Sequence, residues 1–159
     1  QLWRVGDWQS IRNILAKELI FIDETGVNLS LNGLYGCPQK GSRAYAHCSQ
    51  NWGKNLSVIA ALGFKGLLTK VKLMGSVNGL CFDAFVGGKL VLLLWPGACV
   101  VMDNCPIHKP LVIRDMIEQA GARLIYLPPC SPDFSPIENY FSKLKTCLQK
   151  LWARERIPN

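Results

Sequence analysis

Three acidic residues occupy positions from which side chains could do chemistry: Asp23, Asp103 and Glu138. Asp23 directly follows the apolar residues 19–22, and Asp103 directly follows the apolar residues 98–102, so each stands at the end of a predicted strand. If the two strands are neighbours, their carboxylates meet at one edge of a sheet and repel each other unless a cation compensates them. Carboxylate oxygens suit Mg²⁺ and Mn²⁺. The pattern therefore predicts a divalent-metal site with Glu138 as the third ligand.

Each acid also has an ordinary structural explanation. A single Asp at a strand end commonly faces water and binds nothing. Glu138 completes a capping box that begins at Ser135, with Pro136 at the first helical position and Glu138 at the third. The residues alone leave both explanations open, and convergence of the three carboxylates would favour the metal site.

Two further residues could contact a phosphate beside these acids. Lys145 lies seven residues after Glu138 and therefore shares its helix face. His108 follows Asp103 by five residues and would lie above the same sheet edge. A solvated lysine and a structural histidine are equally compatible with these positions.

Zinc is a weaker candidate for the bound metal. The spacing of Cys105 and His108, and that of Cys37, His47 and Cys48, resembles that of zinc ligands. A structural zinc site needs four ligands in paired turns, which these residues do not supply. The seven cysteines are odd in number and form no Cys-x-x-Cys pair, so we predict reduced thiols.

Apolar periodicity outlines the first half of the fold. Asp7 begins a predicted amphipathic helix that ends near Lys17. The strand at 19–22 should end at residues 23–26, where two charges and a glycine indicate that the chain leaves the sheet. Three more segments favour antiparallel strands: 28–35, 55–62 and 67–73.

The second half alternates helices and strands. We predict a helix over 78–94, weakened in its middle by two glycines, then a strand at 98–102. A helix at 110–120 and a strand at 123–127 follow, an order that implies parallel pairing. The proline-dense residues 127–136 lead to a helix of at least four turns, which should pack on the sheet. Its apolar stripe consists of Ile137, Phe141, Leu144, Leu148 and Leu151.

Composition limits the possible classes of protein. The chain has 159 residues, 49% of them hydrophobic, which fits one globular domain and excludes disorder, collagen and coiled coil. No apolar run is long enough for a membrane span, and no leader sequence argues for export. Lys and Arg number 18 against 11 acids, for a net charge of +7, which suits a polyanionic partner such as nucleic acid.

Three segments together resemble a known family: FIDETG at 21–26, VVMDN at 100–104 and LPPCSPDFSPIEN at 127–139. The chain resembles the mariner-like transposase superfamily over nearly its whole length, and more narrowly the bacterial insertion-sequence branch of DDE transposases. The 34 residues between Asp103 and Glu138 equal the separation that this branch uses. Three motifs in this order are far more specific than any one of them.

The resemblance implies a fold and a reaction. The fold is α/β and RNase H-like: a central mixed sheet of three antiparallel strands and then parallel strands, flanked by helices. Asp23, Asp103 and Glu138 would be the catalytic triad and would hold two Mg²⁺ ions, for which Mn²⁺ can substitute. The family cleaves DNA at transposon ends and joins the freed ends to target DNA, commonly at a TA dinucleotide.

The resemblance also implies partners and a cellular setting. Double-stranded DNA would be bound at both transposon ends and target, by a homodimer in the bacterial cytoplasm, associated with the chromosome. The residues expected to contact DNA or its phosphates are Arg43, Asn104, His108 and Lys145.

The chain departs from the family pattern at both ends. Only one predicted helix precedes the first strand, so we expect residues 1–159 to be a single catalytic domain without a helix-turn-helix module and with a shortened C-terminus. Two alternatives to an active transposase follow. One is an inactive fragment that binds DNA or forms dimers, and the other is an RNase H-like nuclease that cleaves other substrates without joining ends.

Overall fold

The centre of the protein is a five-stranded mixed sheet. The computed structural model describes residues 14–28, 40–41, 55–105, 111–127 and 135–155. Its strands are β1 Leu19–Asn28, β2 Asn55–Gly63, β3 Gly66–Met74, β4 Cys99–Met102 and β5 Arg123–Tyr126. They lie in the order β3-β2-β1-β4-β5. β1, β2 and β3 pair antiparallel, whereas β1, β4 and β5 pair parallel, as the sequence predicts.

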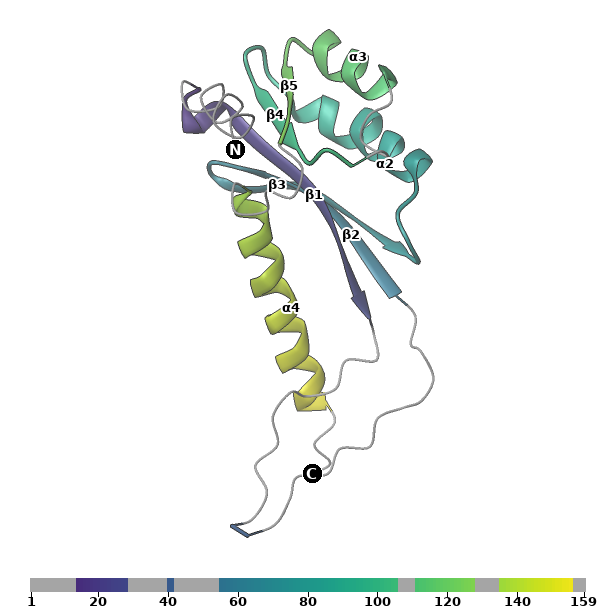
Figure 1. Ribbon diagram of the computed structural model, residues 1–159, viewed down its shortest axis with the longest axis vertical. Helices are drawn as coiled ribbons and strands as arrows, with labels where there is room; N and C mark the ends of the chain where they lie inside the picture. The colour runs from purple at the N-terminus through teal and green to yellow at the C-terminus, as the bar shows by residue number, and fades with distance from the viewer. Residues whose placement is uncertain (1–13, 29–39, 42–54, 106–110, 128–134, 156–159) are drawn as a thin grey trace, which may run out of the picture.

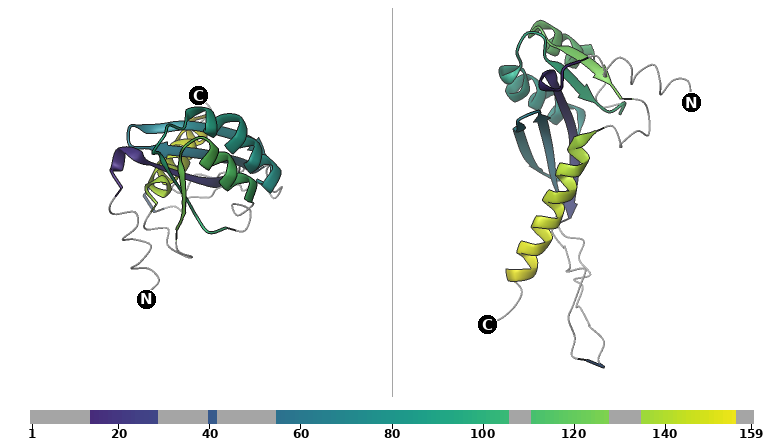
Figure 2. Two further views of the ribbon diagram at one scale, coloured as in Figure 1. Left: turned by 90° about the horizontal axis from the view of Figure 1, so that it is seen from above. Right: turned by 90° about the vertical axis from the view of Figure 1, so that its left-hand side faces the viewer.

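Helices cover both faces of this sheet (Figure 1). They are the 3₁₀ helix η1 Ala16–Glu18, the helix α2 Gly79–Phe85, the π-helix η2 Val86–Leu90, the 3₁₀ helix η3 Val91–Leu93, and the helices α3 Leu111–Gln119 and α4 Pro136–Glu155. Figure 2 shows α4 extending away from α2 and α3. Within the described residues, none of the helices has the length and apolarity needed to cross a membrane.

Alternation along β1 assigns each side chain to one of the two faces. Ile20 and Ile22 are fully or almost fully buried in the main core, together with Phe82 of α2 and Ile117 of α3. Phe21, between them, packs on the opposite face. Because strand side chains alternate in direction, odd-numbered residues of β1 share the face of Phe21.

The predicted end of the first strand is wrong. β1 continues through residues 23–26 to Asn28, because β2 pairs with it along its whole length, from Ile20 opposite Gly63 to Asn28 opposite Asn55. Hydrogen bonding to a long antiparallel partner outweighs the local preference of two acids and a glycine for a loop. Asp23 therefore lies in the middle of a strand, although β4 ends beside it.

Two other predictions fall partly outside the described residues. Of the helix expected at 7–17, the structure describes only the last part, where a bend at Ile14 leads into the short 3₁₀ helix η1. Of the strand expected at 28–35, only Asn28 is described, as the last residue of β1. The strands expected at 55–62, 67–73, 98–102 and 123–127 are confirmed within one or two residues.

The helix predicted over 78–94 is present as three consecutive helical segments. Asn78 caps α2 by accepting a hydrogen bond from the Cys81 backbone N–H at 2.9 Å. The chain then continues through the π-turn η2, which contains both glycines, into η3. A Cβ at Gly87 would lie 2.9 Å from Sδ of Met116, so glycine permits α3 to approach closely here.

Helix α3 ends in a Schellman motif, as the glycine at its end predicts. Gly121 has a φ of 77°, and its N–H donates to the Glu118 carbonyl at 2.9 Å. The Ala122 N–H donates to the Ile117 carbonyl at 3.2 Å. These two bonds satisfy carbonyls at the helix end, and the chain turns directly into β5.

Helix α4 packs on the face of the sheet opposite α2 and α3. Ile137 and Phe141 are 0% and 2% exposed and form a cluster with Ala60 of β2, while Leu144 is partly buried against it. These residues begin the predicted stripe, so the expected packing of this helix on the sheet is confirmed. The first two turns of α4 are therefore fixed over β1 and β2.

Candidate active site

Strand register places Asp23 and Asp103 beside each other. β1 and β4 run parallel, and their last register pair is Ile22 with Met102. The next residue of each strand is one of the two acids, and neighbouring strands lie about 4.8 Å apart. Alternation puts Asp23 on the face that carries Phe21 and Val101, which belong to one cluster, and Asp103 is the first residue after β4, within electrostatic range of Asp23. The topology is compatible with the predicted meeting of these two carboxylates at one edge of the sheet, which stays a prediction.

Helix α4 brings Glu138 to the same face. Ala60 is the register partner of Asp23 on β2, and Ile137 packs against Ala60. Glu138 follows Ile137 and is exposed at the edge of the buried stripe. Its backbone N–H donates to the Ser135 carbonyl at 3.3 Å, and Pro136 is the first helical residue, so the helix begins where the capping pattern predicts.

The surroundings of Asp23 penalise its charged form. Burial is the largest cause, and it raises the pKa of Asp23 from 3.8 to about 7. The backbone N–H of Glu24 donates to Oδ1 of Asp23 at 2.8 Å and lowers the pKa. The carboxylates of Glu138, Glu24 and Asp103 each raise it again, so all of them lie within electrostatic range of Asp23.

This raised pKa predicts a pH-dependent stability. The folded protein keeps the Asp23 proton between pH 3.8 and about 7, whereas the unfolded chain releases it at the lower value. The stabilising contribution is complete below pH 3.8 and is lost as pH rises through about 7. We expect the melting temperature of the metal-free protein to fall over this range more steeply than that of Asp23→Asn. Parallel melting profiles for the two proteins would contradict the raised pKa.

The three acids do not form a ready-made ligand cage. Among the described residues, no three Asp, Glu, His or Cys side chains are close enough together to hold a metal ion. The donor set nevertheless fits a hard divalent cation, because a half-buried carboxyl has two further carboxylates in its electrostatic field and all the donors are oxygens. The three-ligand assignment stays a prediction.

Asp103 is positioned by the turn that follows β4. Its Oδ1 accepts the backbone N–H of Cys105 at 3.2 Å, a local bond of the kind that orients an Asp side chain at a strand end. Asp103 is exposed, and Asn104 beside it is half-buried. One carboxylate oxygen is fixed by this bond, and the side chain stands at the open surface where a substrate could reach it.

The remaining predicted contacts are only partly described. Lys145 is exposed on α4, seven residues and about 10 Å along the helix from Glu138. Asn104 adjoins Asp103 at the end of β4. His108 and Arg43 lie outside the described residues, as do Cys37, His47 and Cys48.

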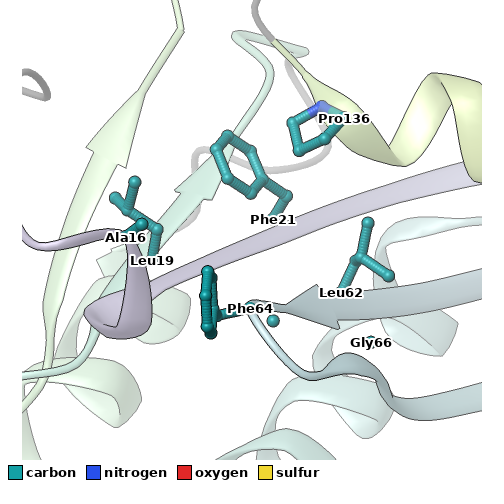
Figure 3. A pocket seen from close by; sticks show the side chains of 8 residues that line it. Ala16, Leu19, Phe21, Leu62, Phe64, Gly66 and Pro136 are labelled. Carbon is teal, nitrogen blue, oxygen red and sulfur yellow. The ribbon is translucent and has the colours of Figure 1, made fainter.

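An apolar pocket of about 390 Å³ on the face of the sheet that carries Phe21 was not predicted from the sequence (Figure 3). Phe21, Leu62, Phe64 and Pro136 line it, with Ala16, Leu19 and two glycines. Phe21 is two residues before Asp23 on β1, and Pro136 is two residues before Glu138 on α4. Each of these two elements therefore carries one residue that lines the pocket and one of the acids. Because side chains alternate along a strand, Phe21 and Asp23 must share a face, and this sequence feature could have predicted the position of Phe21.

Solved structures of the Mos1 transposase share this backbone arrangement. A pre-cleavage Mos1 transpososome matches with a TM-score of 0.71 at 16% identity, over 91% of this chain and 46% of that chain. A Mos1 mariner paired-end complex with Mn matches with a TM-score of 0.70 at 17% identity, over 91% and 46%. The Mos1 catalytic domain with raltegravir and Mn matches with a TM-score of 0.62 at 14% identity, over 98% and 70%.

The structural matches establish the fold, and a match to a family model establishes family membership. The RNase H-like fold predicted from the sequence is confirmed, with a mixed sheet between helices. The chain spans about half the length of the Mos1 chains in the DNA complexes. No curated protein sequence matches it. Residues 18–156 match the family described as "DDE superfamily endonuclease". Because that match covers most of its length, the chain belongs to the DDE superfamily of endonucleases.

Proposed function

We propose that this chain is the catalytic domain of a transposase that cleaves DNA at transposon ends and transfers the ends into target DNA. The observation that supports the proposal is that the carboxylates of Glu138 and Asp103 both lie within electrostatic range of Asp23: Asp103 follows β4, the parallel partner of β1, and Glu138 stands in the first turn of α4, which packs over β1 and β2. Membership of an endonuclease family supports phosphodiester cleavage in general. The resemblance to transposases supports the further step of strand transfer.

The three acids would act together as metal ligands from three different elements of the fold. Asp23, Asp103 and Glu138 would hold two Mg²⁺ ions, or Mn²⁺ in their place. Divalent ions in such a site supply activation of the attacking hydroxyl and stabilisation of the leaving oxygen. Asp23 is fixed in a central strand and gives the site a rigid base, whereas Asp103 and Glu138 are exposed and can adjust to the substrate. Asn104, Lys145, His108 and Arg43 would contact the DNA.

The substrates, the assembly and the cellular location that we propose are those implied by the family resemblance. The substrates would be double-stranded transposon ends and target DNA, and the active form would be a homodimer on DNA. The Mos1 transposase paired-end complex with a transposon end and the Mos1 strand transfer complex support DNA as the partner. The 34-residue separation of Asp103 and Glu138 supports the bacterial insertion-sequence branch, and with it action on the chromosome in bacterial cytoplasm. Residues 1–159 would be one catalytic domain.

A second candidate is a fragment that binds DNA or forms dimers without cleaving. One observation favours it: among the described residues, the acids do not form a ready-made ligand cage. The net charge of +7 would suffice for binding alone.

A two-stage DNA assay distinguishes these functions. The purified chain is incubated with Mg²⁺ and supercoiled DNA that carries candidate transposon ends, and then with a pre-cleaved end and a TA-containing target. We expect nicks with 3′-hydroxyl ends in the first stage and joined products in the second. Cleavage without joining would indicate a nuclease with other substrates, and binding without cleavage would indicate the non-catalytic fragment.

A further inference from the structure

We propose that a basic surface formed by β3 and α4 binds the phosphate backbone of double-stranded DNA next to the acidic site. This β3–α4 surface consists of Lys70, Lys72, Lys143, Lys145 and Lys150, all of them exposed. The inference rests on the proposed function and deepens it, because it names the path of the substrate over the protein. Four of these lysines were not among the residues predicted to contact DNA.

Charge is segregated between the two sides of the sheet. Residues 55–74 and 136–150, which make β2, β3 and most of α4, contain six lysines and a single acid, Glu138. The helices on the other face, at 79–93 and 111–119, contain two basic residues and three acids. The excess positive charge of these segments thus lies on β3, on the turn before it and on α4, where it would attract a polyanion.

Strand register places Lys70 and Lys72 on the same face as Asp23. Asp23 pairs with Ala60, and Ala60 pairs with Lys70, so the three residues form one row across the sheet. Neighbouring strands are about 4.8 Å apart, which puts Lys70 about 10 Å from Asp23 in this row. Lys72 is two residues further along and points to the same face. β3 is the edge strand, so both side chains remain open to solvent.

Helix α4 adds lysines on the sides that do not touch the sheet. Its buried stripe starts with Ile137 and Phe141, which leaves the other positions to solvent. Lys143 and Lys150 are seven residues apart and so share one face of the helix. Lys145 shares the face of Glu138. α4 extends away from α2 and α3 (Figures 1 and 2), so Lys145 continues the helix face of Glu138, while Lys143 and Lys150 lie on a second face of the same helix.

These lysines are not neutralised within the described part of the protein. None of the five forms an ion pair there, whereas Arg114 on the opposite side pairs with Glu118 at 3.7 Å. Unpaired lysines that bind phosphates release counterions, so their contribution to DNA affinity falls steeply with salt. Duplex DNA is the favoured partner because the surface adjoins carboxylates suited to phosphodiester cleavage.

The test measures DNA affinity against salt concentration in the absence of divalent metal. The probe is a fluorescent 30-base-pair duplex of arbitrary sequence, bound by the parent chain, Lys70→Gln/Lys72→Gln and Lys143→Gln/Lys150→Gln. The logarithm of the association constant falls with the logarithm of the salt concentration, and each double variant should make this negative slope shallower by about 2. Each should also weaken binding roughly 10- to 100-fold at low salt. The matched control is Lys89→Gln, an exposed lysine on η2, compared with Lys70→Gln alone.

The outcomes separate this inference from the proposed function. An unchanged slope in both double variants, or an equal loss in Lys89→Gln, would overturn the β3–α4 surface. If the double variants lost affinity for a polyglutamate probe but kept the parent chain's affinity for DNA, the proposal of a DNA-binding surface would be overturned in favour of an acidic protein partner. Mg²⁺-dependent nicking is measured in parallel on the parent chain, so the surface can fail while cleavage persists, and cleavage can fail while the salt dependence persists.

Discussion

Replacement of Asp103 by Asn should lower the rate of Mg²⁺-dependent DNA cleavage by at least about a thousand-fold, because a metal ligand supplies several kcal/mol of transition-state stabilisation. Asn preserves the size of the side chain and keeps an oxygen that can accept the Cys105 N–H, so the turn after β4 should survive. Asp103 is exposed, so the fold does not depend on its burial. The measurement is the initial rate of nicking of supercoiled DNA at fixed Mg²⁺.

The matched control for this variant is Asp115→Asn. Asp115 is an exposed aspartate on α3, on the opposite side of the sheet from the proposed site, and the substitution removes the same charge. It should leave the rate unchanged. Equal cleavage rates for Asp103→Asn and the parent chain would show that Asp103 is not a catalytic residue.

Replacement of Phe141 by Ala should destabilise the protein by about 3–5 kcal/mol, the usual cost of deleting a buried aromatic ring. Phe141 is 2% exposed and packs with Ile137 against Ala60, the register partner of Asp23. The cavity would lie beneath the first turns of α4, which carry Glu138. The free energy of unfolding is measured by urea denaturation, and nicking is measured under conditions where the variant stays folded.

The matched control is Phe64→Ala, which removes the same ring from a position that is 72% exposed. We expect a change in unfolding free energy below about 1 kcal/mol for this variant. If Phe141→Ala were no more destabilising than Phe64→Ala, α4 would not be anchored through this contact. The folded fraction of Phe141→Ala should also cleave more slowly, because the position of Glu138 depends on the same packing.

Apolar periodicity predicted most of the fold because both faces of the sheet must be covered. The alternating β–α–β order at 98–127 allowed the parallel pairing of β4 and β5 to be predicted, and the step of four and three residues from Ile137 allowed α4 to be predicted. The end of β1 could not be predicted in the same way. Asp23 and Glu24 look like strand-end residues locally, but pairing with β2 carries the strand on to Asn28. Such pairing is a long-range interaction that no local pattern contains.

The candidate site was predictable in its residues but not in its geometry. The acids stood out because two of them follow apolar runs and the third follows a capping serine. The alignment of Ile22 with Met102, which puts Asp23 and Asp103 side by side, depends on strand order and register. The row from Asp23 through Ala60 to Lys70 likewise depends on the antiparallel register of β1, β2 and β3. Neither relation can be read from residue spacing.

Mn²⁺ binding, measured by titration calorimetry, tests most directly whether the three acids form one metal site. The proteins compared are the parent chain, the double variant Asp23→Asn/Asp103→Asn, Glu138→Gln and the control Asp115→Asn. We expect saturable binding by the parent chain and the control, none by the double variant, and weakened binding by Glu138→Gln. Equal binding by the parent chain and the double variant would contradict the assignment of these carboxylates as a metal site.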